Sequence, residues 1–315
     1  MKKKFIAKKR KNGNFKVKFK FFLFLFFFIV SVSVVYNFYL KKNYIVDNKI
    51  LVDLIMNNSS IYKKDSSLFK DTINNLFVPY KLISRNYKGL VNVSKKKEIK
   101  TVVKEEKKEY KPYIYIYNSH QSEEYIPSNY LSYTVKPTVS INNYIMEDVF
   151  KKNGYDVLVE ERSIKDIINN NGWNYASSYR ASRVYLDDVK KTYPSLEVFI
   201  DVHRDSLNRD KTTITIGDKN YAKIIFLIGL ENSNYQVNLS FTEKINNIIE
   251  SRYPGLSKGI YKKGGAGVNG VYNQDFSGKA ILVEIGGVDN TIEEVMNSSI
   301  VVSNIISEVI QKDES

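Results

Sequence analysis

Hydrophobic residues along this chain form one long run near the amino terminus and a series of shorter runs after residue 110. The shorter runs are rich in β-branched and aromatic residues, which is typical of strands buried in a sheet. Segments with apolar residues three or four positions apart lie between them, and this spacing indicates helices. We expect strands at 113–118, 155–161, 196–203, 221–230 and 279–287, and helices at 138–154, 176–193, 240–253 and after Asn290.

Strands that alternate with helices predict an α/β fold in which a mostly parallel sheet carries helices on both faces. We expect this domain to span residues 111–315. Its last helix is expected to begin at Asn290, because Glu293 three residues later completes a capping-box-like pattern.

The long hydrophobic run covers residues 21–40 and contains no charged residue. About 20 apolar residues are enough for a helix to cross a bilayer. The alternatives are a buried core helix and a cleaved signal peptide, but the apolar part of a signal peptide is usually only about 7 to 15 residues long. We therefore expect a transmembrane anchor, single-pass in the cell membrane.

Residues 1–20 carry ten lysines and arginines and no acid, so +10 of the net charge of +14 lies there. The positive-inside rule makes this segment a cytoplasmic tail and places everything after the anchor outside the membrane. Residues 41–110 end in a run of mixed charges and are expected to form an extracytoplasmic stalk or linker, with a short helix near 47–57. Because the basic excess outside the tail is small, nucleic acid is not an expected partner.

The candidate chemistry lies where the predicted strands end. The chain has no cysteine, so disulfides and thiolate ligands are excluded and any metal must be held by imidazole and carboxylate groups. It has only two histidines, His120 and His203, and each follows a predicted strand beside acidic residues. The carboxyl ends of parallel strands meet at one edge of a sheet. We expect His120, Glu123 and His203 to hold Zn²⁺ there, if the turn after His120 curls helically.

Glu284 is the other candidate, because it interrupts an apolar strand in which an unpaired carboxylate is costly. It could form a salt bridge with Arg183 or Arg204. Alternatively, it could act as the catalytic general base that takes a proton from the attacking water. Asp201 and Asp205 are candidates to orient the histidine rings.

Three residues are expected to contact the substrate: Arg183, Arg204 and Gln274. Arg180 and Arg183 lie on one predicted helix, where they most simply face solvent, although either could bind a carboxylate in a bidentate way. The glycine-rich stretch 255–279 is expected to be a flexible loop over a cleft.

Four motifs in chain order resemble a known family: YIYNSHQSEEY, WNYASSYRASR, FIDVHRDS and YNQDFSGKAILVEIGGVDNTIEEV. Over residues 112–312 they look like stage II sporulation protein P, a cell-wall hydrolase of endospore-forming bacteria. The first motif departs from the family, which commonly reads His-Thr-His where this chain has Asn118, Ser119 and His120.

This resemblance implies a membrane-anchored zinc amidase with the related amidase fold, which cuts the N-acetylmuramic acid–L-alanine bond of peptidoglycan. It also implies endopeptidase activity on cross-links and work beside stage II sporulation protein D during engulfment. Two histidines and a glutamate hold zinc in the broader fold, and a late glutamate is catalytic. His203 and Glu284 match these roles, and Glu123 is the expected glutamate ligand, with Glu147 and Glu160 as the next candidates.

Two other functions stay open from the sequence. The domain could be a non-catalytic module that binds cell wall and recruits other hydrolases. It could also be a metal-free glycosidase, because two carboxylates such as Glu123 and Glu284 are sufficient for that chemistry.

Overall fold

The structure is a computed structural model that describes residues 13–35, 48–49, 52, 56, 110–126, 128–130, 133–135 and 137–314. The expected cytoplasmic tail lies mostly outside these ranges, and so does nearly all of the expected stalk. Within the stalk, Asn48, Lys49, Val52 and Met56 are helical, in agreement with the short helix expected near 47–57.

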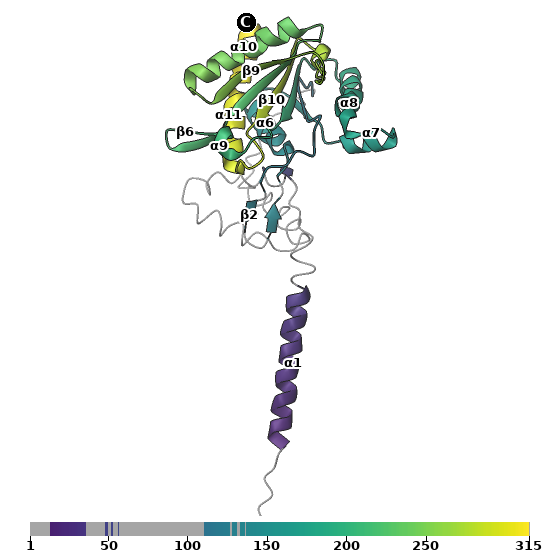
Figure 1. Cartoon of the computed structure of the whole chain (residues 1–315), viewed down its shortest axis with the longest axis vertical. Helices are drawn as coiled ribbons and strands as arrows, with labels where there is room; N and C mark the ends of the chain where they lie inside the picture. Colours follow the sequence, from purple (N-terminus) through teal and green to yellow (C-terminus); the bar gives the residue numbers. More distant parts are fainter. Residues whose placement is uncertain are drawn as a thin grey trace, which may run out of the picture. The chain divides into compact units, whose positions relative to one another are not determined.

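Helix α1 (Gly13–Val35) contains the first part of the long hydrophobic run (Figure 1). Among the residues that the structure describes, no helix combines the length and hydropathy expected of a membrane span. The anchor expected over 21–40 is therefore not supported, and residues 36–40 lie outside the described part of the chain.

The strands of the central sheet are β1 (Ile114–Tyr117), β4 (Val157–Val159), β5 (Val198–His203), β8 (Ile224–Gly229), β9 (Ser257–Lys263) and β10 (Lys279–Ile285). They lie in the order β4-β1-β5-β10-β8-β9. All neighbours are parallel except β10 and β8, which are antiparallel. The sheet is thus mostly parallel, as expected, with β8 and β9 running opposite to the other four strands.

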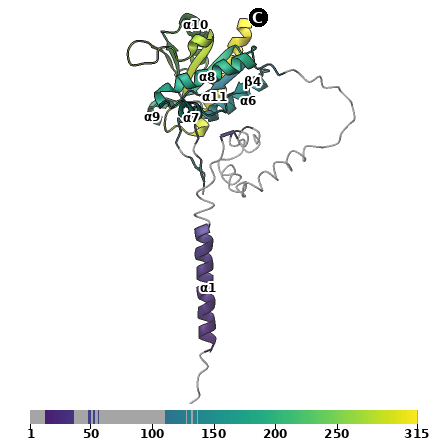
Figure 2. The ribbon, with the colours of Figure 1, turned by 90° about the vertical axis from the view of Figure 1, so that its right-hand side faces the viewer.

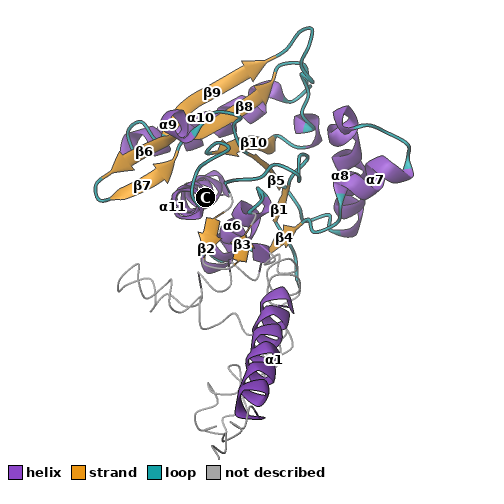
Figure 3. Ribbon diagram, turned by 60° about the horizontal axis from the view of Figure 1, so that its bottom comes forward, coloured by secondary structure: helices purple, strands orange, loops and turns teal. Residues whose placement is uncertain are grey.

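The main helices of the domain are α6 (Ser140–Lys152), α7 (Ile164–Asn170), α8 (Ser178–Thr192), α10 (Tyr235–Arg252) and α11 (Ile292–Glu314). Helices α6, α10 and α11 cover one face of the sheet, where they contact alternate strand residues such as Ile116 and Ile200. Helix α8 covers the other face and packs against Tyr115, Tyr117 and Phe199. Helix α7 packs on α8, and Figures 2 and 3 show this pair of helices beside the sheet. Strand β1 is buried on both faces, which explains its unbroken apolar sequence.

The smaller elements are β2 (Ser128–Tyr130), β3 (Tyr133–Val135), the 3₁₀ turns η2 (Tyr175–Ser177) and η3 (Gln274–Phe276), α9 (Arg209–Thr212), and the hairpin of β6 (Thr213–Ile216) and β7 (Lys219–Ala222). The glycine-rich stretch is only partly a loop, because its residues 257–263 form β9 at the edge of the sheet.

Helix α11 begins slightly later than expected. Glu294, not Glu293, forms the capping box: its carboxylate accepts from the Thr291 N–H at 3.1 Å, and its own N–H donates to Thr291 Oγ1 at 3.3 Å. Asn290 instead supports the turn before the helix, where its side-chain oxygen accepts from the Gly287 N–H at 2.7 Å.

The strand register determines which polar side chains meet. His203 of β5 is paired with Glu284 of β10, and Asp201 is paired with Leu282. Aligned residues on neighbouring strands point to the same face of a sheet. Asp201, His203 and Glu284 therefore share the face that α8 covers, at the carboxyl ends of β5 and β10.

Candidate metal centre

His120 and Glu123 are brought together by a tight turn after β1. The turn is closed by a backbone hydrogen bond from the Glu123 N–H to the His120 carbonyl at 3.1 Å. Beyond the turn, Tyr125 is buried, and its hydroxyl donates to the Ile285 carbonyl at 2.7 Å and accepts from the Asn142 amide at 2.8 Å. The turn therefore curls as the sequence interpretation required.

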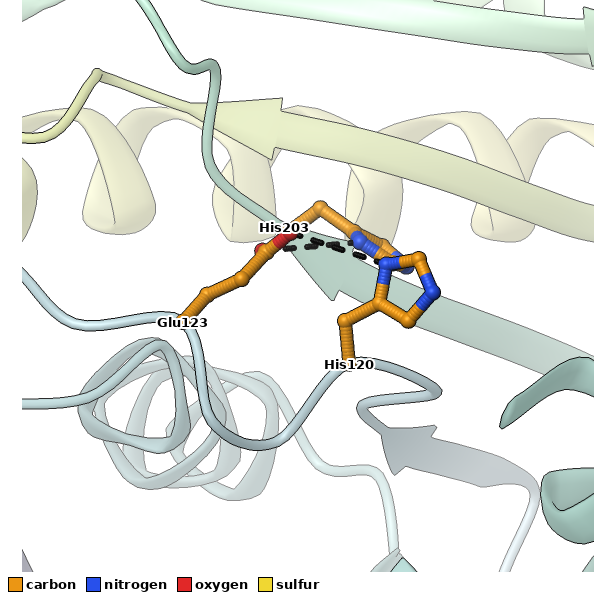
Figure 4. Close-up of side chains that lie close together, drawn as sticks. All are labelled: His120, Glu123 and His203. Carbon is orange, nitrogen blue, oxygen red and sulfur yellow. Dashed lines mark ion pairs between the residues drawn. The ribbon is translucent and has the colours of Figure 1, made fainter. Parts of the chain in front are cut away.

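The two imidazoles and the Glu123 carboxylate converge from separate parts of the chain (Figure 4). One Glu123 oxygen lies 3.6 Å from His120 Nδ1, and the other lies 3.5 Å from His203 Nδ1. One potential ligand atom from each of the three residues lies within 4.8 Å of the other two. The His203 side chain is 5% exposed, whereas those of Glu123 and His120 are 19% and 26% exposed, so the site is open on one side.

This donor set fits a zinc ion. Two imidazole nitrogens and one carboxylate form a recognised ligand set for catalytic zinc, which leaves a fourth position for water or substrate. Ligand atoms about 2.0 to 2.1 Å from a tetrahedral ion lie about 3.3 Å apart. The two nitrogen–oxygen separations at Glu123 are close to this value and longer than a good hydrogen bond.

Asp201 and Ser119 hold the outer edge of the His203 ring. His203 Nε2 lies 3.1 Å from Asp201 Oδ1 and 3.0 Å from Ser119 Oγ. Asp201 also accepts from the Ser119 N–H at 2.8 Å and from its hydroxyl at 2.7 Å. Burial by itself lowers the pKa of His203, but the Asp201 and Glu123 carboxylates raise it to about 10. With Nε2 held in this way, Nδ1 is directed at Glu123, and this is the support that a ligating histidine normally needs.

Glu123 is held in its ionised form. Its burial raises its pKa, but contacts with both imidazoles and a hydrogen bond from the Arg204 N–H at 3.0 Å lower it to about 2. A carboxylate that is ionised and fixed in place is suited to ligate a cation.

Glu284 lies beside this centre without a partner. Among the described residues, none donates a hydrogen bond to its carboxylate or forms an ion pair with it. Arg183 instead pairs with Asp187 and Asp275, and the Arg204 guanidinium donates to backbone carbonyls, so the alternative of a salt bridge from Glu284 to either arginine is not found. Burial, reinforced by the negative charge of Asp205, raises the pKa of Glu284. A carboxylate with a raised pKa is a better proton acceptor than an ordinary one.

The other candidate ligands, Glu147 and Glu160, lie elsewhere, and so does Asp205, the second candidate to orient a histidine ring. Asp205 pairs with Lys258 at 3.2 Å, and no contact with either histidine is found among the described residues. Glu147 pairs with Lys151 on the surface of α6. Glu160 is buried at the end of β4, where it accepts from the Tyr115 hydroxyl at 2.6 Å. These residues therefore do not join His120, Glu123 and His203.

The Asn118 side chain makes hydrogen bonds within the protein core. Its amide donates to the Val202 carbonyl at 2.7 Å and exchanges hydrogen bonds with Asn143 of α6. It thus joins the end of β1 to β5 and α6, on the side of the sheet away from His203.

Of the residues expected to contact the substrate, Gln274 is buried against the backbone of β8 and Arg204 lies close to the centre. The amide of Gln274 is buried, where its oxygen accepts from the Gly229 N–H and its nitrogen donates to the Leu227 carbonyl. Because both polar groups serve the backbone of β8, this placement argues against substrate binding by Gln274. The Arg204 guanidinium donates to the Glu124 and Asp205 carbonyls, close to the centre.

Sequence reasoning missed the aromatic residues around the centre. Tyr175 stacks on His120, with 5.1 Å between the ring centroids. The ring centroid of Tyr179 on α8 lies 5.3 Å from that of His120 and 6.4 Å from that of His203. The motif WNYASSYRASR contains both tyrosines, and their four-residue spacing was the available signal.

The comparisons with known proteins agree with the four motifs. The sequence matches the stage II sporulation protein P family over residues 60–307. It is 34% identical, over 205 residues, to stage II sporulation protein P of Bacillus subtilis (strain 168), an alignment that covers 63% of this chain and 51% of that protein. The chain thus spans about half the length of this curated relative.

Two solved structures are similar to a lower degree. The CwlD amidase from Clostridioides difficile, in complex with the GerS lipoprotein, gives a TM-score of 0.42 at 11% identity and covers 64% of this chain and 97% of that one. Cwp6 from Clostridium difficile gives a TM-score of 0.39 at 12% identity and covers 64% of this chain and 29% of that one. These TM-scores are too low to support conclusions about the present chain. The family match covers most of the sequence, and the chain therefore belongs to the stage II sporulation protein P family.

Proposed function

We propose that this protein is a zinc-dependent peptidoglycan hydrolase that cleaves the amide bond between N-acetylmuramic acid and L-alanine, with peptide cross-links as a further substrate. The observation that carries the proposal is the convergence of His120, Glu123 and His203 beside the unpaired Glu284. The activity itself comes from the family resemblance, and the arrangement of these four side chains supports it.

Each side chain of the site has a separate role in the proposed hydrolysis. His120, Glu123 and His203 would hold the ion, which when bound supplies Lewis acidity that polarises a carbonyl oxygen and makes water more acidic. Glu284, on the strand next to His203, takes a proton from the attacking water and can return it to the leaving amine. Asp201 and Ser119 keep His203 in one orientation during the reaction.

The test measures zinc and products together on the purified full chain. We expect one zinc per chain and the release of stem peptides with new amino termini from isolated cell wall. The substitution Glu284→Gln should lower the rate by a factor of about 10² to 10⁴, the usual contribution of a general base, while zinc content stays unchanged. His203→Ala should lose both zinc and activity. The control is Glu293→Gln, which makes the same acid-to-amide change at an exposed position of α11 and should lose neither.

Other outcomes would reject the proposal in recognisable ways. New reducing ends in place of stem peptides would identify a glycosidase, although the position of Glu123 between two imidazoles does not suit that chemistry. A chain that pellets with cell wall but holds no stoichiometric zinc and releases nothing would be a binding module.

The cellular setting is part of the same proposal. We propose that the enzyme acts outside the cell membrane during engulfment, beside stage II sporulation protein D, and that residues 21–40 attach it to the membrane. This rests on the sequence pattern and on the family resemblance. Fractionation of sporulating cells, with and without residues 21–40, would test the attachment.

A further inference from the structure

A groove runs along α8 next to the metal centre. Its cavity volume is about 500 Å³; one wall is Trp173 with residues of α8, and the opposite wall is the segment 269–275. Tyr179 lines this groove and also contacts both histidine rings, so the groove begins where the metal centre ends. We call it the α8 groove. Nothing in the proposed chemistry uses it.

The two arginines of the α8 groove are in different electrostatic states. Arg183 donates to both oxygens of Asp275, at 2.8 and 3.0 Å, and to Asp187 at 3.2 Å, so its charge is already neutralised by the protein. Arg180 is exposed, and none of the described acidic residues pairs with it. The groove therefore offers one unneutralised guanidinium, and it is the one nearer to the amino end of α8.

Trp173 holds the Arg180 guanidinium in place. The centre of the guanidinium lies 4.0 Å from the centroid of the indole ring. A guanidinium stacked on an aromatic face keeps the N–H groups at its edge free to donate, and the stacking reduces the entropy lost when it binds an anion. Across the groove, the Asn269 side-chain oxygen accepts from the Val271 and Tyr272 N–H groups, and its NH₂ group has no partner among the described residues. A second donor is thus available in the same groove.

We propose that the α8 groove binds the peptide part of the substrate and that Arg180 binds a free carboxylate of that peptide. The proposal rests on the proposed function, because the stem peptide of peptidoglycan carries such carboxylates. Arg180 is then a specificity residue: it favours stems with free carboxylates over stems in which these groups are amidated. Arg183, in contrast, shapes the groove by joining α8 to η3.

The chain provides its own reporter for this groove, since Trp173 is its only tryptophan. The experiment titrates the purified full chain with a synthetic stem tripeptide that has free carboxylates, and with the same tripeptide in amidated form, and follows tryptophan fluorescence. The Kd is taken from the dependence of Trp173 emission on peptide concentration. A change in the starting emission caused by a substitution therefore does not affect it. Zinc and catalysis are not needed for this readout, and repeating it with a chelator separates peptide binding from the hydrolytic activity.

We expect the free-acid peptide to bind about tenfold more tightly than the amidated one, as for one charge-assisted pair at a partly exposed site. Arg180→Ala should remove this difference, and Arg180→Lys should recover part of it because the charge is kept without the planar fork. Lys191→Ala, which removes one exposed charge from the same helix, is the matched control and should bind like the unchanged chain. In hydrolysis, Arg180→Ala should raise KM about tenfold for the free-acid substrate and leave kcat unchanged.

Equal binding of the two peptides to the unchanged chain would overturn the proposal, as would an equal loss in Lys191→Ala. The absence of any change in tryptophan emission on adding peptide would also overturn it. If the chain binds the free-acid peptide selectively but hydrolyses nothing, the groove assignment holds and the proposed function fails.

Discussion

Substitution of Asp201 by asparagine tests how the proposed metal centre is supported. The Asp201 side chain is only 1% exposed and accepts from two groups of Ser119, while its Oδ1 lies 3.1 Å from His203 Nε2. Asparagine has nearly the same shape but replaces one accepting oxygen by a donating NH₂ group and removes the charge. At least one of the three donors around position 201 then loses its acceptor.

The magnitude follows from the lost interaction. A hydrogen bond to a charged group contributes about 1.5 to 3 kcal/mol, which corresponds to a factor of roughly 10 to 150 in an equilibrium constant. Loss of the group that orients a ligating histidine typically weakens metal binding about 10- to 100-fold. We therefore expect Asp201→Asn to raise the Kd for zinc by about one to two orders of magnitude.

The assay is a competition titration of the metal-stripped full chain against a chromophoric zinc chelator. The control is Asp205→Asn, which removes an acidic group close to the same strand ends that pairs with Lys258 and not with a histidine. We expect less than about a threefold change for this control, because one partly solvated charge has only a small effect. Unchanged zinc affinity in Asp201→Asn, or an equal loss in both variants, would refute the role assigned to Asp201.

Three further predictions concern stability, each measured by urea unfolding. Tyr115→Phe should lower the free energy of unfolding by about 1 to 3 kcal/mol, because it removes the 2.6 Å hydrogen bond from the Tyr115 hydroxyl to the buried Glu160 carboxylate. Phe199→Ala should cost about 3 to 5 kcal/mol, since the ring is buried between the sheet and α8; a cost below 1 kcal/mol would mean that this core layer can collapse. Burial raises the pKa of Glu294, but hydrogen bonds from Arg209 and Asn290 lower it below its usual value. Its contribution to stability should therefore be present above the pKa of the unfolded chain, near 4, and disappear as the pH falls through the lower folded value. Glu294→Gln should show a correspondingly smaller loss on acidification, and equal pH dependence in both proteins would contradict this.

The sequence was sufficient to predict the strands that carry the centre. Strands β1, β5 and β10 lie in the middle of the sheet, so their side chains are buried on both faces and read as continuous apolar runs. The ends of these runs placed His120, His203 and Glu284 together, because parallel strands present their carboxyl ends at one edge. The three-residue spacing to Glu123 then required only a single turn.

Other features depend on contacts that a linear pattern does not contain. Strand β9 is an edge strand with exposed lysines and with Gly259 inside it, so it lacks the apolar run that identified the central strands. The reversed direction of β8 leaves no trace in its composition. Arg180 and Arg183 look alike in the sequence, but Arg183 is neutralised by Asp187 and by Asp275, and Asp275 is 92 residues away along the chain.

The loop that carries His120 and Glu123 is fastened on both sides by buried groups, with Asn118 before it and the Tyr125 hydroxyl after it. A loop tethered in this way loses little configurational entropy when an ion arrives, so the protein has met most of the cost of ordering during folding. Its backbone amides should consequently exchange slowly with deuterated solvent even in the metal-stripped protein. Ion capture would then proceed by simple encounter, with no preceding rearrangement of the loop.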